Sequence, residues 1–134
     1  MSSRAFDIMR ELPAIFATAT GIDAADVEIG WRDPETIEPD QLPRVLVYNP
    51  SATDPEVAEF GLRNVEFGFA VVVVNALDTD EATLELCELM AGAVNVASFT
   101  NADSAVMGSG SVVIVAERKR AIVGALMTAQ WEGV

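Results

Sequence analysis

Apolar residues recur at helical spacing in the N-terminal part of the chain. Met9 and Leu12 follow Phe6 at steps of one helical turn, and charged residues occupy positions between them. An amphipathic helix is therefore expected here, with Pro13 kinking it or starting a second short turn and Gly21 ending it.

Strand-like patterns follow in the middle and in the C-terminal half of the chain. Some of these segments alternate apolar and polar residues, whereas Val71–Val74 form a continuous apolar run of the kind found where a strand is covered on both faces. In the last segment, alternate residues from Ala121 to Trp131 share one face. The expected strands lie at residues 26–31, 44–49, 64–76, 112–117 and 121–131.

Polar segments separate the expected strands. Residues 32–43 are predicted to form a proline-rich acidic loop, and residues 50–60 a loop or a single helical turn, because prolines exclude a central strand. Residues 100–111 are expected to be a flexible connection. They contain "GSGS", which resembles a phosphate-binding loop only in its glycines and lacks the Lys-Ser/Thr ending.

A second helix is expected to start close to Thr79. Asp78 and Glu81 have the spacing of a capping box, and the acidic first turn suits the helix dipole. The apolar face of this helix contains Leu86, Met90 and Val94, which are expected to be buried against a sheet. Replacement of Leu86 by Ala is accordingly predicted to cost about 2–5 kcal/mol.

The order of these patterns predicts one domain that spans residues 1–134. Helical and strand periodicities are segregated, which favours an α+β fold: a mixed, mainly antiparallel sheet of about four to five strands with two main helices packed on it. The longest uncharged run is too short to span a membrane, and the N-terminus lacks the apolar core of a signal peptide. We therefore expect a soluble protein of the cytoplasm with no membrane partner.

Acidic residues dominate the charge of the chain. It carries 21 acidic and 8 basic residues and a net charge of −13, with the acidic residues spread along its whole length. Such a surface repels nucleic-acid phosphates, but it suits a path through which DNA passes without specific binding. A solubilising surface is the simpler interpretation of most of these residues.

The composition excludes several kinds of catalytic site. The chain has no histidine and a single cysteine, Cys87, so a zinc site built on cysteines and a Ser-His or Cys-His pair are both excluded. Cys87 falls on the apolar helix face and is expected in the core. Asp78, Asp80 and Glu81 are interpreted as a helix start rather than a magnesium site. We expect no catalytic residue, no cofactor and no metal, and hence no enzyme.

Basic residues are concentrated in "AERKRAI" at residues 116–122, where Arg118, Lys119 and Arg120 are three of the eight bases. They form either a solvated hairpin turn, whose charges discourage pairing with foreign strands, or a cationic loop that contacts an acidic partner.

Partner contacts can be proposed on both sides of such an interface. The candidate acidic counterparts of the cationic loop are Asp54, Glu56 and Glu59. Tryptophan is over-represented at interfaces, so Trp31 and Trp131 are each interpreted as either sheet packing or an interface anchor. Trp131, close to the end of the chain, is the stronger candidate.

The order of elements resembles the tail-terminator, or tail-completion, family of long-tailed bacteriophages and prophages. The resemblance covers nearly the whole chain and rests on "LPRVLVY" after the proline-rich loop, on "LRNVEFGFAVVVVNA" running into "DTDEATLELCELMAGAV", and on the closing "RAIVGALMTAQWEG". The family has no catalytic or ligand signature, so no functional residue is transferred from it. The strong acidity and the polar segment 32–40 depart from its usual pattern.

The resemblance implies a structural virion protein without enzymatic activity. Such a protein assembles with copies of itself into a ring, usually a hexamer, at the head-proximal end of the tail tube. The ring stops tube growth and joins the tail tube protein to the head-tail connector protein, and DNA passes through it. The protein would occur in the host cytoplasm during assembly and then in the virion tail. The alternative is a small cytoplasmic ligand-binding or regulatory domain, with a pocket between the second helix and the valine strand.

Overall fold

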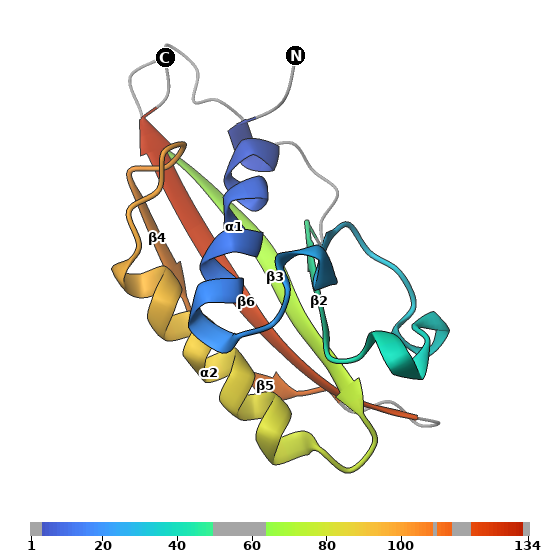
Figure 1. The fold of residues 1–134 in the computed structure, drawn as a ribbon. Coiled ribbons are helices and arrows are strands. Elements are labelled where there is room, and N and C mark those ends of the chain that lie inside the picture. The colour runs from blue at the N-terminus through green and yellow to red at the C-terminus, as the bar shows by residue number, and fades with distance from the viewer. Residues whose placement is uncertain (1–3, 50–63, 109, 114–118, 133–134) are drawn as a thin grey trace.

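Two helices pack on one face of a six-stranded sheet in the computed structural model, which describes residues 4–49, 64–108, 110–113 and 119–132 (Figure 1). The helices are α1 (Arg4–Thr20) and α2 (Asp80–Val96). The strands are β1 (Val27–Ile29), β2 (Arg44–Tyr48), β3 (Asn64–Ala76), β4 (Ser104–Met107), β5 (Ser111–Val112) and β6 (Arg120–Glu132). The predicted α+β fold is confirmed, with one strand more than expected.

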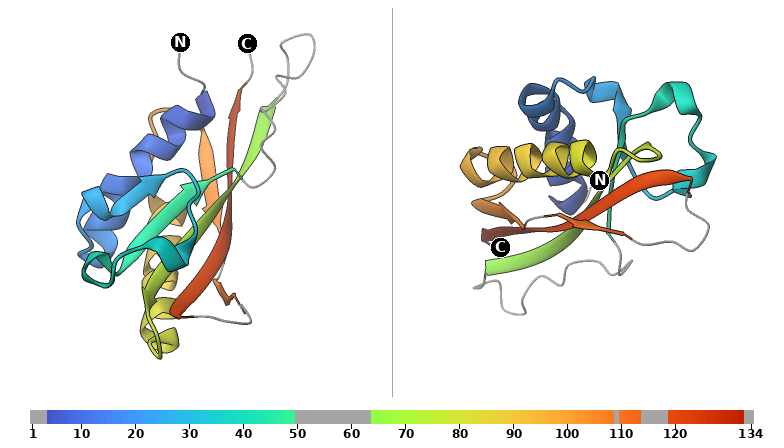
Figure 2. Two further views of the ribbon diagram at one scale, coloured as in Figure 1. Left: turned by 90° about the vertical axis from the view of Figure 1, so that its right-hand side faces the viewer. Right: turned by 90° about the horizontal axis from the view of Figure 1, so that it is seen from below.

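The sheet has the strand order β1-β2-β3-β6-β4, and β5 also pairs with β6. Only the β1–β2 pair is parallel among the described strands, so the sheet is mixed and mainly antiparallel. The longest strand pairing in the sheet is between β3 and β6. Its register runs from Asn64 opposite Glu132 to Ala76 opposite Arg120. Both helices lie on the same side of this ladder, as the view from below shows (Figure 2).

The main core lies between the two helices and the sheet. Alternate residues of β3 and β6 point into it, as the period-two pattern of the sequence predicts. Met90 and Val94 of α2 are buried there as expected, and Cys87 is fully buried. The sheet residues of this core include Phe67, Phe69, Val71, Val73, Val123, Ala125, Met127, Ala129 and Trp131.

A second, smaller core lies on the opposite face of the sheet. There Ile37, from the loop between β1 and β2, packs on Val72, Val74 and Ile122. Two short 3₁₀ turns, Pro34–Thr36 and Pro39–Gln41, shape this loop. The valine run is thus covered on both faces, which confirms the interpretation of the continuous apolar run.

Helix α1 runs without interruption through Pro13, so the predicted second turn is absent and the residues on both sides of the proline belong to one helix. The helix ends as predicted at Gly21, whose φ of 81° is the left-handed conformation that glycine adopts without strain. The amide of Gly21 donates to the carbonyl of Ala17 at 2.9 Å and closes the last turn.

The predicted capping box of α2 is wrong. Thr79 occupies the N-cap position and makes no side-chain cap bond, while Asp78 lies one residue earlier in a tight turn with a φ of 66°. Aspartate tolerates this left-handed conformation better than most residues. Because Asp78 forms part of the turn, it does not occupy the N-cap position of α2. The expectation that Leu86 is buried is also wrong: Leu86 is only partly buried at the edge of the main core, one residue before the buried Cys87.

The segment expected to be a flexible connection contains strand β4. This strand has four residues, of which only Met107 is buried. So short a segment shows little alternation of apolar and polar residues. Strand β4 is at the edge of the described sheet, where Asn95 of α2 binds the backbone of Met107. The Asn95 side chain accepts from the Met107 amide at 3.0 Å and donates to the Met107 carbonyl at 3.3 Å. The strand expected at 112–117 is seen only at its start, as β5, and its remaining residues lie mostly outside the described part of the chain.

No helix among the described residues has the length and apolarity needed to cross a membrane.

Candidate interaction surfaces

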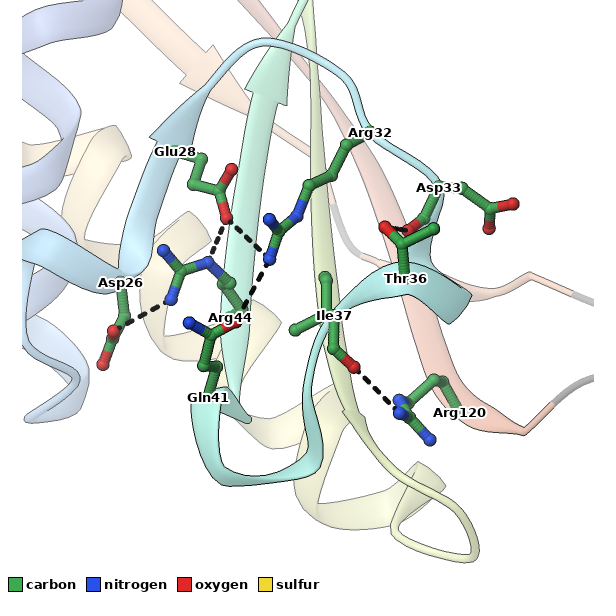
Figure 3. A network of polar contacts seen from close by, with 9 residues as sticks. All are labelled: Asp26, Glu28, Arg32, Asp33, Thr36, Ile37, Gln41, Arg44 and Arg120. Atoms are coloured by element: carbon green, nitrogen blue, oxygen red, sulfur yellow. Dashed lines mark hydrogen bonds and ion pairs between the residues drawn. The ribbon is translucent and has the colours of Figure 1, made fainter.

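Arginine side chains fix the loop between β1 and β2 (Figure 3). Arg44 of β2 is only 15% exposed and lies between two carboxylates: its Nη1 is 3.1 Å from Asp26 Oδ1, and its Nε donates to Glu28. Arg32 approaches the same Glu28 carboxylate at 3.4 Å and donates to Gln41 across the loop. These contacts link both ends of the loop to β1 and β2, so its position on the sheet is defined.

The predicted cationic cluster is joined to this loop in the same chain. The Lys119 amide donates to Glu35 Oε1 at 2.9 Å. Arg120 donates from Nη2 to the Ile37 carbonyl at 2.9 Å (Figure 3). Its Nη1 donates to the Lys119 carbonyl at 3.0 Å. Arg120 therefore anchors the start of β6 to the loop and is not a free cation at a hairpin tip. Arg118 lies outside the described residues.

The acidic counterparts proposed for this cluster, Asp54, Glu56 and Glu59, also lie outside the described residues, so their contact with it stays a prediction. Trp131 is only 5% exposed and packs in the main core, which removes it from the exposed surface of the chain. Trp31 is 57% exposed. Trp131 therefore follows the sheet-packing alternative, and the role of Trp31 as an interface anchor stays a prediction.

An apolar surface remains on the face of the sheet that carries neither helix. The register places Ala70 opposite Leu126 and Val72 opposite Gly124, and these residues line an open groove of about 500 Å³. Leu126 is 67% exposed, although it lies in the middle of the sheet. Val106 of β4 is on the same face and is 62% exposed. Sequence reasoning missed this surface, although alternate residues of the last strand include the apolar Ile122 and Leu126.

A second cavity of about 380 Å³ adjoins this groove where the β1–β2 loop meets the sheet. We name it the Trp31 pocket. Trp31 and Tyr48 form one wall, with ring centroids 5.0 Å apart and planes tilted by 57°. The pocket is lined by Trp31, Asp33, Pro34, Glu35, Tyr48, Val72, Val113 and Ile122. Its lining is mainly aromatic and apolar and includes two acidic residues, Asp33 and Glu35.

Several carboxylates gather at the start of α2. Asp78, Glu81 and Glu85 surround a shallow hollow of about 330 Å³. No group of three or more potential ligand residues is close enough to hold a metal ion within the described parts of the chain. Asp80 and Glu81 lie in the first turn of α2, and the absence of a magnesium site there stays a prediction.

Cys87 is fully buried in the main core, as predicted. Burial, and to a smaller extent the negative charge of Glu88, raises the pKa of its thiol from the usual 9 to about 11. The thiol is thus protonated at neutral pH, and a protonated, inaccessible sulfur is not a nucleophile.

Comparison with known proteins adds no relative: no protein-family model matches the chain, and no curated protein sequence matches it significantly. The function must therefore be argued from the surfaces described above.

Proposed function

We propose that the chain is a structural virion protein, a tail terminator that forms a ring with copies of itself at the head-proximal end of a phage tail tube. The proposal combines the resemblance in element order with one observation, the exposed apolar face of the sheet. A large exposed apolar patch on a small domain is typical of a surface that another protein covers. In the proposed ring, part of this face contacts the next subunit.

A closed ring needs a head-to-tail interface in which two different surfaces of each subunit meet. The helix-free face supplies one apolar surface, centred on Leu126 and Val106. The net charge of −13 opposes assembly, because like-charged subunits repel one another at low salt. Assembly of wild-type protein is therefore expected to improve when salt rises from low to moderate concentration.

The same acidity suits the proposed passage of DNA, because a lumen without a basic stripe gives phosphates nothing to bind. The tail tube protein and the head-tail connector protein are the proposed partners at the two rims of the ring. The role proposed for the chain is mechanical and needs no catalytic residue.

The cationic cluster remains a candidate contact in this ring, and its test must keep Arg120 unchanged. Replacement of all three bases would also remove the Arg120 anchor on the Ile37 carbonyl and disturb the fold. The appropriate variant replaces Arg118 and Lys119 by Ser and keeps Arg120. A matched control replaces the exposed Arg4 and Arg10 by Ser and changes the net charge equally. Slower assembly of the first variant alone would support the contact.

A tube-growth assay tests the proposed function directly. The tail tube protein of the same phage or prophage is polymerised with and without the chain, and tube lengths are measured by electron microscopy. A terminator is expected to cap one end and to shorten tubes at far less than one copy per tube subunit. An unchanged length distribution at equimolar chain would contradict the proposal.

The alternative function, a ligand-binding or regulatory domain, was expected to place its pocket between α2 and the valine strand. That interface is filled by fully buried side chains, among them Thr83, Cys87 and Met90. The cavities on the opposite face give the alternative its only specific support among the described residues. A stable monomer that binds a small molecule there would favour it over the ring.

A further inference from the structure

We propose that helix α2 of one copy of the chain packs into the groove on the helix-free sheet face of the next copy. This inference rests on the ring proposed above and names the two surfaces that meet in it. On α2 the contact is made by three exposed residues, Leu89, Gly92 and Val96, which we name the α2 stripe. On the sheet it is made by the open groove of about 500 Å³ beside Leu126.

The two most exposed of the large apolar side chains that the structure describes lie on these surfaces. Val96 is 84% exposed and Leu126 is 67% exposed. Leu89 and Gly92 are exposed on the same side of α2 as Val96, because positions three, four and seven residues apart share one face of a helix. Apolar side chains that gather on an open surface are typical of a site that another protein covers.

The two surfaces lie on opposite sides of the molecule. The buried residues of α2, among them Met90 and Val94, belong to the main core, so the α2 stripe points away from the sheet. Leu126 lies on the other face of the sheet, and Figure 2 shows both helices on one side of it. Each copy can therefore contact one neighbour through α2 and another through the sheet, as a head-to-tail ring requires. A contact between two sheet faces would end at a dimer.

Electrostatics favours these two surfaces for a contact between copies. Each copy carries a net charge of −13, so a contact between acidic surfaces is opposed by like-charge repulsion. Residues 89–102, which include the α2 stripe, contain no charged side chain, whereas Glu81, Glu85 and Glu88 are exposed in the first half of the helix. None of the described residues that line the groove is charged. A second copy can therefore dock here without placing carboxylates in the contact.

The shapes of the two surfaces also match. Leu126 stands beside the groove, and Gly124 leaves the groove open because it has no side chain. On α2, Gly92 leaves a gap between Leu89 and Val96, since a Cβ atom built there would have no neighbour within 4 Å. In the proposed contact Leu126 of one copy enters the gap at Gly92 of the next, and Val96 enters the groove.

A pair of charge variants on α2 tests the contact by sedimentation at moderate salt. Gly92→Glu places a carboxylate in the α2 stripe at a position where a side chain meets no neighbour in the monomer. Its matched control, Ala82→Glu, makes the same change in net charge at an exposed position in the acidic half of the helix. Gly92→Glu is expected to raise the concentration needed for assembly at least about tenfold, because a charge is buried without a partner. Ala82→Glu should assemble nearly as well as wild type.

Engineered cysteines test which surfaces meet. The native Cys87 is fully buried, so the reactive thiols come from the substitutions. Copies with Val96→Cys are mixed with larger, tagged copies with Leu126→Cys and treated with a short bis-maleimide reagent. The proposed contact predicts covalent pairs with one copy of each kind, and few pairs when either variant is treated alone. In the control mixture Ala25→Cys, at an exposed position before β1, replaces Val96→Cys and should give no pairs above background.

The outcomes separate this inference from the proposed ring. If wild type forms a ring, equal assembly of Gly92→Glu, a lack of mixed pairs, or pairs between two Leu126→Cys copies would overturn the contact and leave the ring standing. A wild-type chain that stays monomeric with the tail tube protein present would overturn both. If circular dichroism shows that Gly92→Glu is unfolded, Val96→Glu takes its place, and full assembly of that variant would also reject the contact.

Discussion

Gly110 lies where the backbone before β5 passes directly under α2, and its replacement by Ala is predicted to destabilise the fold. A Cβ atom added at Gly110 would lie 2.6 Å from Cys87 Sγ and 2.7 Å from Val123 Cγ1. Non-bonded heavy atoms are optimally separated by about 3.5–4.0 Å, so both contacts are severe overlaps. Neither Cys87 nor Val123 can move freely, since both are fully buried in the main core.

The expected cost of Gly110→Ala is about 1–3 kcal/mol, the usual penalty for an extra methyl group in a packed core. Urea unfolding followed by tryptophan fluorescence gives the free energy of unfolding, with the buried Trp131 as the reporter. The matched control is Gly92→Ala, at an exposed position of α2 where the added Cβ atom has no neighbour within 4 Å. Helix propensity predicts that this control stabilises the protein by about 0.5–1 kcal/mol.

A double-mutant cycle identifies the cause of the loss. Cys87→Ala removes the sulfur atom from the overlap but leaves the Val123 contact, so it should restore part of the stability lost in Gly110→Ala. The coupling energy expected between these neighbours is about 0.5–1.5 kcal/mol. An ordinary surface change alters the free energy of unfolding by less than about 0.5 kcal/mol. If Gly110→Ala has so small an effect, Gly110 does not pack against Cys87 and Val123 as described.

Three further predictions concern the core, the loop and pH. Met90→Ala should lower the free energy of unfolding in urea by about 2–5 kcal/mol, and Leu86→Ala clearly less because Leu86 is half-buried. Equal losses in the two variants would contradict their different burial. Arg44→Met should cost about 1–3 kcal/mol, because Glu28 loses a partly buried partner, and an unchanged midpoint would show that the pair contributes nothing. The raised pKa of Cys87 means that the unfolded thiol ionises first, so stability should fall as pH rises from 9 to about 11. In Cys87→Ala, the part of this decrease in stability that comes from the thiol should be absent. Rapid reaction of the native thiol with a disulfide reagent at pH 8 would contradict its burial.

The elements with strong periodicity were predictable from the sequence. The alternate residues from Ala121 to Trp131 are all buried, and those from Val123 onward belong to the main core. The valine run is buried on both sides, as its continuous apolarity indicates. The end of α1 at Gly21 was also predictable, because a left-handed residue at that position favours glycine. In these places the local pattern and the tertiary contacts act in the same direction.

The features that depend on contacts between distant segments were not predictable. Strand β4 is held in place by β6 and by Asn95, and its own sequence carries almost no pattern. The engagement of Arg120 with Ile37 joins residues that are far apart in the chain, so a basic stretch in the sequence was interpreted as a free loop. The exposure of Trp31 likewise follows from the path of the β1–β2 loop.

The mass of the protein in solution, measured by sedimentation at moderate salt with and without the tail tube protein, tests the central claim most directly. The account predicts a closed ring of one fixed stoichiometry, formed by the chain alone or on the end of the tube. It also predicts that a charged residue at the centre of the exposed sheet face, Leu126→Glu, abolishes the ring while the monomer stays folded. A wild-type chain that remains monomeric at high concentration, even with the tube protein present, would contradict the claim.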